Sequence, residues 1–134
     1  MLSEVILLCA LASPPTISDM NDYVDCRNRN EIIIFMEDYI PLFSQYFKKK
    51  DIEQALRISY CESRGKSTAV GINKDGSKDV GLWQFNDRTW EWLSKKLKIT
   101  SDRTNIRVST AVASWLFYND GDHHWNPSKK CWDF

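Results

Sequence analysis

The chain has 134 residues and no net charge, and 43% of its residues are hydrophobic and 27% charged. This length fits one domain, and six Trp, five Tyr and six Phe beside only five Gly and four Pro exclude a disordered or collagen-like chain. No run of about 18 apolar residues is present, which excludes a membrane-spanning helix, and the balanced charge gives no reason to expect nucleic acid as a partner.

The N-terminus begins with an apolar segment that ends in Ala10-Leu11-Ala12, the small-x-small pattern that precedes signal-peptidase cleavage. We therefore expect a signal peptide over residues 1–12 and an extracellular, secreted protein that starts at Ser13. The segment carries Glu4 and no Lys or Arg before its apolar core, so a retained and buried N-terminal segment is the alternative.

Four cysteines constrain the disulfides. Removing Cys9 with a signal peptide leaves an odd number, so at most one intramolecular bridge forms. We expect Cys61 to pair with Cys131, which would tie the C-terminal tail to the middle of the chain and stabilise it by roughly 4 kcal/mol in the chain-entropy model. Cys26 is then unpaired, or pairs with Cys9 if the N-terminal segment is retained. There is no C-x-x-C, so we expect no zinc ribbon and no redox motif.

Charge is unevenly distributed along the chain. Residues 13–47 carry two Arg and six acidic residues, a net charge of −4, whereas from Lys48 onward 16 Lys and Arg face 11 Asp and Glu, a net charge of +5. The basic part favours an anionic polymer such as a bacterial wall, in an interaction that salt would weaken. A solvated basic surface without a partner is the alternative.

The first third of the chain has weak signals. Residues 13–30 are mostly polar and are interpreted as an arm or loop without function. The apolar stretch 31–39 fits a buried helix or a strand, and periodicity cannot decide between them. Pro41 marks the first turn of a helix that we expect to reach about Lys49.

Asp51 begins the clearest helix of the chain, with Gln54 completing an approximate capping box and Gly65 ending it after Arg64. On this helix, Glu62 shares a stripe with apolar residues at steps of three and four, so its carboxyl group should point inward. Burial would raise the pKa of that carboxyl group, as a general acid near neutral pH requires. A partly exposed glutamate at a helix end is the alternative.

Residues 70–81 alternate around Asp75-Gly76, which predicts a β-hairpin. Asp79 lies on the returning strand, in a polar stretch where we expect it to stay ionised. The alternating polar residues are not a calcium loop, because the glycine has the wrong offset and no Glu stands at the twelfth position.

Beyond the hairpin, an extended segment leads into a helix that starts near Asp87. Gln84 and Asn86 flank one apolar residue and should point to the same side, where amides can bind sugar hydroxyl or N-acetyl groups. The aromatic residues of this region are either core residues or a sugar-stacking face: Trp83, Phe85 and Trp90.

The last predicted helix runs from about Asp102 to Tyr118, with an apolar stripe that we interpret as core. A turn with Asp120, His123 and His124 follows. These side chains could hold a metal, but adjacent histidines in a loop are more often solvated or hydrogen-bonded, so we predict no metal site.

The motifs together resemble a known family. The following residues are similar, in order and without a gap, to the active-site stretch of c-type lysozymes: Glu62-Ser63, Ala69, Asn73, Asp75-Gly76-Ser77, Asp79, Gly81, Gln84, Asn86, Arg88 and Trp90. The 17-residue step from Glu62 to Asp79 is the most specific part. Cys61-Glu62-Ser63 and the tail from Trp125 to Cys131 also resemble resuscitation-promoting factors and single-glutamate lytic transglycosylases of the same superfamily. The resemblance covers about residues 41–132.

The resemblance implies a mostly helical α+β protein with a lysozyme-like fold, in which a small β-hairpin lies beside the catalytic helix. The catalytic domain would span 41–134, after an arm and apolar helix at 13–40. It implies a muramidase that cleaves the β-1,4 bond of peptidoglycan, with Glu62 as general acid and Asp79 as nucleophile or stabiliser. The implied substrate-binding residues are Asn73, Gln84, Asn86, Trp90, Asp120 and Trp125. It also places Cys131 at the family cysteine that pairs back to the catalytic helix. No cofactor is implied, and we expect a monomer.

The sequence departs from the c-type pattern at several points. Only one of that family's four disulfides can form, Thr89 stands in place of a stacking Trp, and the N-terminal arm has no counterpart. Two alternatives stay open: a lytic transglycosylase that uses Glu62 alone and gives 1,6-anhydro products, and a glycan-binding protein without catalysis.

Overall fold

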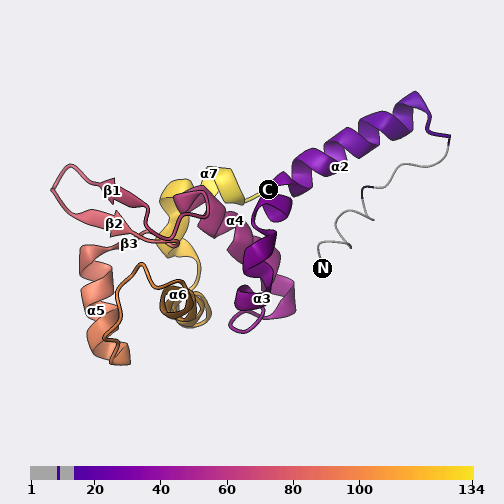
Figure 1. Ribbon diagram of the computed structural model, residues 1–134. Helices are drawn as coiled ribbons and strands as arrows, with labels where there is room; N and C mark the ends of the chain where they lie inside the picture. The colour runs from indigo at the N-terminus through magenta and orange to yellow at the C-terminus, as the bar shows by residue number, and fades with distance from the viewer. Residues whose placement is uncertain (1–8, 10–13) are drawn as a thin grey trace.

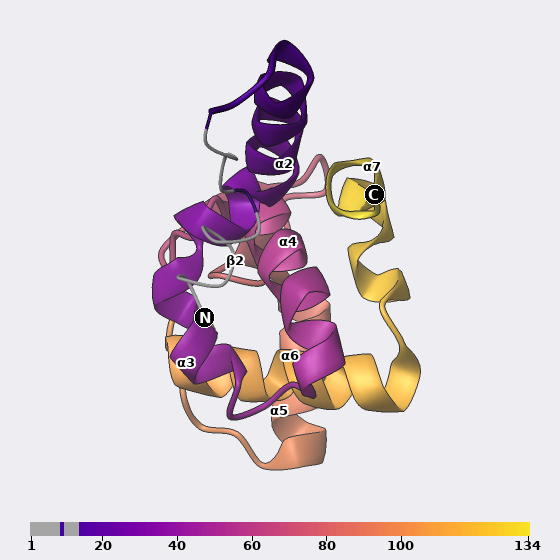
Figure 2. The ribbon, with the colours of Figure 1, turned by 90° about the vertical axis from the view of Figure 1, so that its right-hand side faces the viewer.

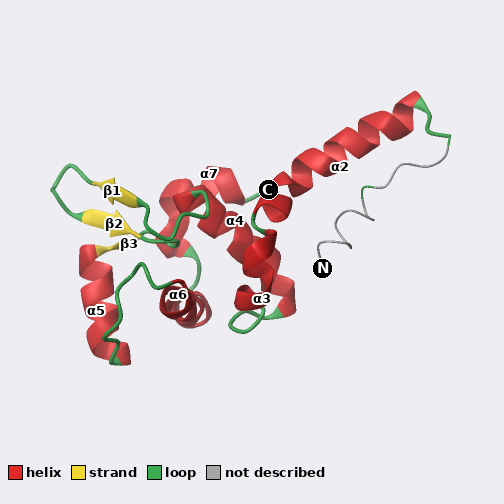
Figure 3. Ribbon diagram, viewed as in Figure 1, coloured by secondary structure: helices red, strands yellow, loops and turns green. Residues whose placement is uncertain are grey.

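The structure, a computed structural model, describes Cys9 and residues 14–134; the predicted signal peptide otherwise lies outside the described residues. In order, the elements are α2 (Ile17–Phe35), η1 (Glu37–Tyr39), α3 (Ile40–Phe43), η2 (Lys49–Asp51), α4 (Ile52–Ser63), β1 (Val70–Ile72), β2 (Lys78–Val80), β3 (Phe85–Asn86), α5 (Asp87–Leu97), α6 (Ile106–Asp120), η3 (His123–Ser128) and α7 (Lys129–Trp132). Helices dominate, and the strands gather at one end (Figure 3). The mostly helical α+β prediction is confirmed. None of the helices described is both apolar enough and long enough to cross a membrane.

Within residues 13–30, interpreted as an arm or loop, the chain from Ile17 onward is a helix and not a loop. Thr16 and Asp19 form a capping box, in which the Thr16 hydroxyl accepts from the Asp19 N–H and the Asp19 carboxylate accepts from the Thr16 N–H. The helix continues into the apolar stretch as far as Phe35, so this part of the stretch is a helix and not a strand. α2 projects away from the rest of the molecule (Figures 1 and 2).

The helix at Pro41 differs from the prediction in its end, and the helix at Asp51 differs in its cap. Pro41 lies in the first turn of α3, but α3 ends at Phe43, where the Ser44 hydroxyl donates to the Ile40 carbonyl. α4 has the predicted range, yet Asp51 makes no capping hydrogen bond. Its carboxylate accepts from the Tyr118 hydroxyl instead, and Gln54 donates to Asp122. Tertiary partners have replaced the local capping box.

The predicted hairpin is confirmed, and a third strand extends it. β1, β2 and β3 are antiparallel in that order, with Gly71 opposite Asp79 and Asp79 opposite Asn86. After β2 the chain turns at Gly81 with φ 91°, where a Cβ would lie 2.5 Å from the Arg103 carbonyl oxygen. Only glycine fits this close approach.

α5 starts at Asp87 as predicted, capped by the Asn86 side chain. α6 starts four residues later than expected, at Ile106. The Asp102 carboxylate accepts from the Thr104 N–H and hydroxyl in a turn, and Asn105 provides the helix cap.

The core forms around α4, which packs against α2, α3, η3 and α7. Trp83 lies at its centre, 1% exposed, with its indole N–H donating to the Thr110 hydroxyl. The predicted Cys61–Cys131 disulfide is present and links α4 to α7. A second disulfide joins Cys9 to Cys26, the pairing expected for a chain that retains its N-terminal segment.

Candidate active site

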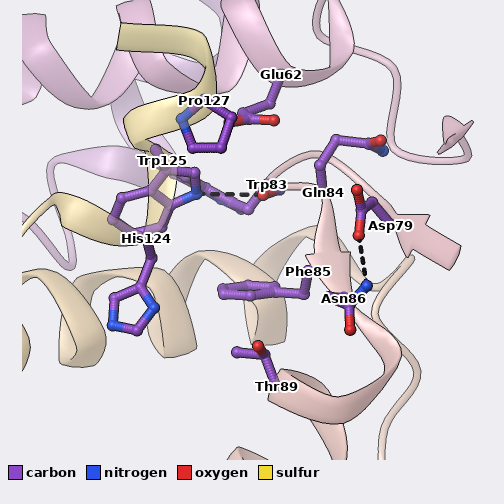
Figure 4. A pocket seen from close by; sticks show the side chains of 10 residues that line it. All are labelled: Glu62, Asp79, Trp83, Gln84, Phe85, Asn86, Thr89, His124, Trp125 and Pro127. Carbon is purple, nitrogen blue, oxygen red and sulfur yellow. Dashed lines mark hydrogen bonds between the residues drawn. The ribbon is translucent and has the colours of Figure 1, made fainter. Parts of the chain in front are cut away.

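Glu62 lies in the last turn of α4, half-buried as its stripe predicts. The helix ends at the next residue, Ser63, because Arg64 adopts a left-handed conformation with φ 57°, followed by Gly65 with φ 77°. The chain therefore turns away toward the hairpin, and the Glu62 carboxyl group faces the space between α4 and the sheet (Figure 4).

The pKa of Glu62 is raised to about 7, chiefly because the carboxyl group is buried, and further because the negative charge of Asp79 lies nearby. The Ser128 hydroxyl opposes this shift, since it donates to Glu62 Oε1 at 2.8 Å and so stabilises the ionised form. Near neutral pH, Glu62 is therefore poised to hold or release a proton.

Asp79 is held on β2 by two amide groups. Asn86 Nδ2 donates to Asp79 Oδ1 at 2.9 Å, and Asn73 Nδ2 donates to the same oxygen at 3.2 Å. The Asn86 side chain also accepts from the Arg88 N–H, so it caps α5 and orients Asp79 together. The second oxygen, Oδ2, receives no hydrogen bond from the part of the chain that the structure describes.

Both carboxyl groups line one cavity of about 220 Å³ (Figure 4). Its lining consists of Glu62, Asp79, Trp83, Gln84, Phe85, Asn86, Thr89, His124, Trp125 and Pro127. Three aromatic rings, each less than 5% exposed, form the apolar wall: Trp83, Phe85 and Trp125. The Trp125 indole N–H donates to the Trp83 carbonyl at 3.2 Å, which fixes that ring beside the acid. An apolar wall with a few converging polar groups is typical of small-molecule and sugar sites.

A family model described as a lysozyme-like domain matches residues 44–127. The chain belongs to the lysozyme-like domain family. Membership assigns it to the enzymes that degrade peptidoglycan, as glycosidases or transglycosylases, without deciding between the two. None of the curated proteins matches the chain.

The lysozyme-like domain brings five of the eight residues expected at the catalytic and substrate-binding site into the cavity: Glu62, Asp79, Gln84, Asn86 and Trp125. The other three lie outside its lining. Asn73 supports Asp79 from the hairpin, and Trp90 packs on Phe85 with ring centroids 5.3 Å apart. Asp120, at the end of α6, bonds to His123 and His124 instead.

Gln84 lines the cavity from a backbone conformation that differs from the extended one expected. Its φ of 51° breaks the extended backbone on which the same-side argument relied. The Gln84 amide nitrogen donates to the carbonyls of Ala69 and Gly81, which holds the side chain in place. Only its amide oxygen remains to accept a hydrogen bond from a ligand.

Ser128 is the functional contact that sequence reasoning missed. It lies 66 residues after Glu62, in a 3-10 helix that no local pattern indicates. Its hydroxyl has two acceptors, Glu62 Oε1 and the Trp125 carbonyl at 3.1 Å, but only one proton to donate. The hydroxyl orientation is thus coupled to the protonation of Glu62.

Proposed function

We propose that this lysozyme-like domain is a secreted muramidase that hydrolyses the β-1,4 bond of peptidoglycan. Glu62 would act as general acid, and Asp79 as the nucleophile or stabiliser at the anomeric carbon. The observation that carries the proposal is the contrast between the two carboxyl groups of one cavity. Glu62 has a pKa raised to about 7 by burial, whereas Asp79 is bound by two amide donors that suit a carboxylate.

In this mechanism, protonated Glu62 donates its proton to the glycosidic oxygen as the bond to the anomeric carbon breaks. The Asp79 carboxylate stabilises the positive charge that develops on the sugar ring, or bonds to the anomeric carbon. The Glu62 carboxylate then takes a proton from the water that completes hydrolysis, which restores the acid. The Ser128 hydroxyl stabilises that carboxylate between the two steps, because it donates to Oε1.

The side-chain amides of Asn86, Asn73 and Gln84 would have different roles. Both functional atoms of Asn86 are engaged, its nitrogen by Asp79 and its oxygen by the Arg88 N–H, so we assign it to positioning Asp79. Asn73 has the same task from β1's side of the hairpin. The Gln84 oxygen would accept from a sugar hydroxyl or N-acetyl N–H, while Trp125 shields the acid from water.

A lytic transglycosylase is the second candidate, and the same two amides support it. They bind one oxygen of Asp79 and thereby tie the hairpin to β3, a role that requires no chemistry from Asp79. Glu62 alone would then protonate the leaving oxygen and accept the proton of the substrate's own 6-hydroxyl, which closes a 1,6-anhydro ring.

Mass analysis of the soluble fragments from peptidoglycan digestion separates the candidates. Reducing ends support hydrolysis, whereas fragments lighter by one water carry anhydro ends and indicate a transglycosylase. Glu62→Gln should lower activity by about 10²–10⁴-fold in either enzyme. Asp79→Asn should cause a loss of similar size only in the hydrolase.

Matched controls come from the helices α4 and α5. Glu53→Gln changes an exposed carboxylate on α4, and Glu91→Gln changes one on α5, and both variants should keep near-normal activity. Unchanged digestion by Glu62→Gln would exclude both mechanisms, whereas a wild-type protein that binds peptidoglycan and releases no fragments would support the glycan-binding alternative.

A further inference from the structure

The only two histidines of the chain lie together beside Asp120, where α6 ends and η3 begins. His123 Nε2 lies 3.2 Å and His124 Nε2 lies 2.7 Å from the same oxygen, Asp120 Oδ2. One ligand atom from each of the three side chains lies within 4.8 Å of the others. Two imidazole nitrogens and one carboxylate oxygen are therefore close enough to contact one ion.

This convergence is built into the local backbone. Gly121, with φ 83°, ends α6 directly after Asp120, and the chain re-enters a 3-10 helix at His123. The two consecutive imidazole rings consequently lie side by side in a tilted arrangement, with centroids 4.1 Å apart and an interplanar angle of 33°. Adjacent residues normally point in different directions, and here both rings turn toward one carboxylate.

We propose that Asp120, His123 and His124 form a binding site for a divalent transition-metal ion of the zinc class. Zinc binds imidazole nitrogen and carboxylate oxygen at about 2.0–2.2 Å, which puts tetrahedral ligands roughly 3.3 Å apart. The nitrogen–oxygen separations of 3.2 and 2.7 Å are close to this value, and all three ligand atoms lie within 4.8 Å of one another, so side-chain rotations alone would admit the ion. Two nitrogens and one oxygen suit Zn²⁺, Ni²⁺ or Cu²⁺, whereas Mg²⁺ and Ca²⁺ prefer oxygen ligands alone.

The three side chains are accessible to an ion, and no cysteine thiolate competes with them for it. The side chains of His123, His124 and Asp120 are 56%, 23% and 50% exposed, so an ion can enter without unfolding. All four cysteines are in disulfides, which removes thiolates as rival ligands. With three protein ligands, a fourth position stays open to water. His124 also lines the cavity that contains Glu62 and Asp79 (Figure 4).

A zinc titration of the tag-free protein, followed by calorimetry and by NMR of the imidazole protons, tests the proposal. Because both histidines belong to the site, every imidazole signal reports on it. We expect one Zn²⁺ per chain and shifts of both imidazoles, with no such shifts from Mg²⁺. Binding requires neither Glu62 nor Asp79, so its outcome is independent of the proposed muramidase activity.

Two exposed-site variants sharpen the test. His123→Asn and Asp120→Asn each remove one ligand and should weaken zinc binding by at least about tenfold. The control is Glu91→Gln, which changes an exposed carboxylate on α5 outside the cluster and should bind zinc as the wild type does. Thermal unfolding verifies that each variant is folded. Imidazole signals that stay in place during the titration, or unchanged affinity in both ligand variants, would overturn the proposal; so would a response to Mg²⁺ equal to that to Zn²⁺.

Discussion

The α2 arm and the lysozyme-like body are both helical, but they are held together differently. Along α2, Ile17, Met20 and Val24 are more than half exposed, and the helix joins the core only at its C-terminal end, where Ile33 and Met36 are buried. In the body, the rings of Phe43, Phe47 and Trp125 pack around Trp83, with centroids 5.3, 5.7 and 5.6 Å from its own. The comparison teaches that a local capping signal is enough to define a helix, whereas a site needs residues that only packing brings together.

The largest expected difference between the two regions concerns their disulfides. Replacing Cys61 and Cys131 by Ser opens a 70-residue loop that links α4 to α7 and should lower the free energy of unfolding by about 4 kcal/mol. Replacing Cys9 and Cys26 opens a loop confined to the arm, so the unfolding transition of the body should change by less than about 1 kcal/mol. Denaturant titrations monitored by Trp fluorescence measure both effects. Equal losses would show that arm and body unfold as one unit.

The second prediction concerns the cost of burying Glu62. A carboxyl group whose pKa is raised from 4.5 to about 7 in the folded state binds a proton that the unfolded chain has released, so stability falls as the pH rises through this window. Glu62→Gln should therefore be more stable than the wild type at pH 8 by about 2 kcal/mol, allowing for partial solvent screening, and equally stable near pH 4. The control Glu53→Gln should show no such pH dependence. A Glu62→Gln protein that gains nothing at pH 8 would contradict the raised pKa.

The third prediction uses the Ser128 hydroxyl, which favours the ionised form of Glu62. In Ser128→Ala this donor is lost, so the pKa of Glu62 should rise further. A general acid is active while protonated, and activity is lost as the pH rises through its pKa. The alkaline limb of the pH–activity profile should consequently move to higher pH, with a change in maximal rate of no more than about tenfold. Ser128→Thr, which keeps a hydroxyl, serves as the control, and an alkaline limb that moves to lower pH would refute the coupling.

The smallest effect is expected in the arm. Thr16→Ala removes the hydroxyl that caps α2 and should cost about 1 kcal/mol of local helix stability, visible as faster amide exchange in residues 17–20. Peptidoglycan digestion should be unchanged, because none of the α2 side chains that the structure describes lines the cavity. Loss of activity in this variant would show that the arm contributes to the site.

The sequence by itself determined the elements whose signals are local. The helix that carries Glu62, the hairpin around Asp75-Gly76 and the start of α5 at Asp87 all have the predicted positions. Glu62 is half-buried, as its shared stripe with Ile58 implied. These features follow from periodicity and turn chemistry, which act over a few residues. The capping box at Thr16 is an equally local signal that the composition of residues 13–30 obscured.

The tertiary structure alone decided the features that depend on distant partners. Asp51 and Gln54 do not form the predicted capping box. Asp51 accepts from Tyr118 and Gln54 donates to Asp122, because these partners come close only after α4 and α6 pack. Ser128 reaches Glu62 across 66 residues for the same reason. Hydrogen bonds between far-apart residues carry no periodic signature in the sequence. The sequence alone therefore indicated Glu62 as the acid, whereas the Ser128 hydroxyl that lowers the pKa of Glu62 could be found only from the tertiary structure.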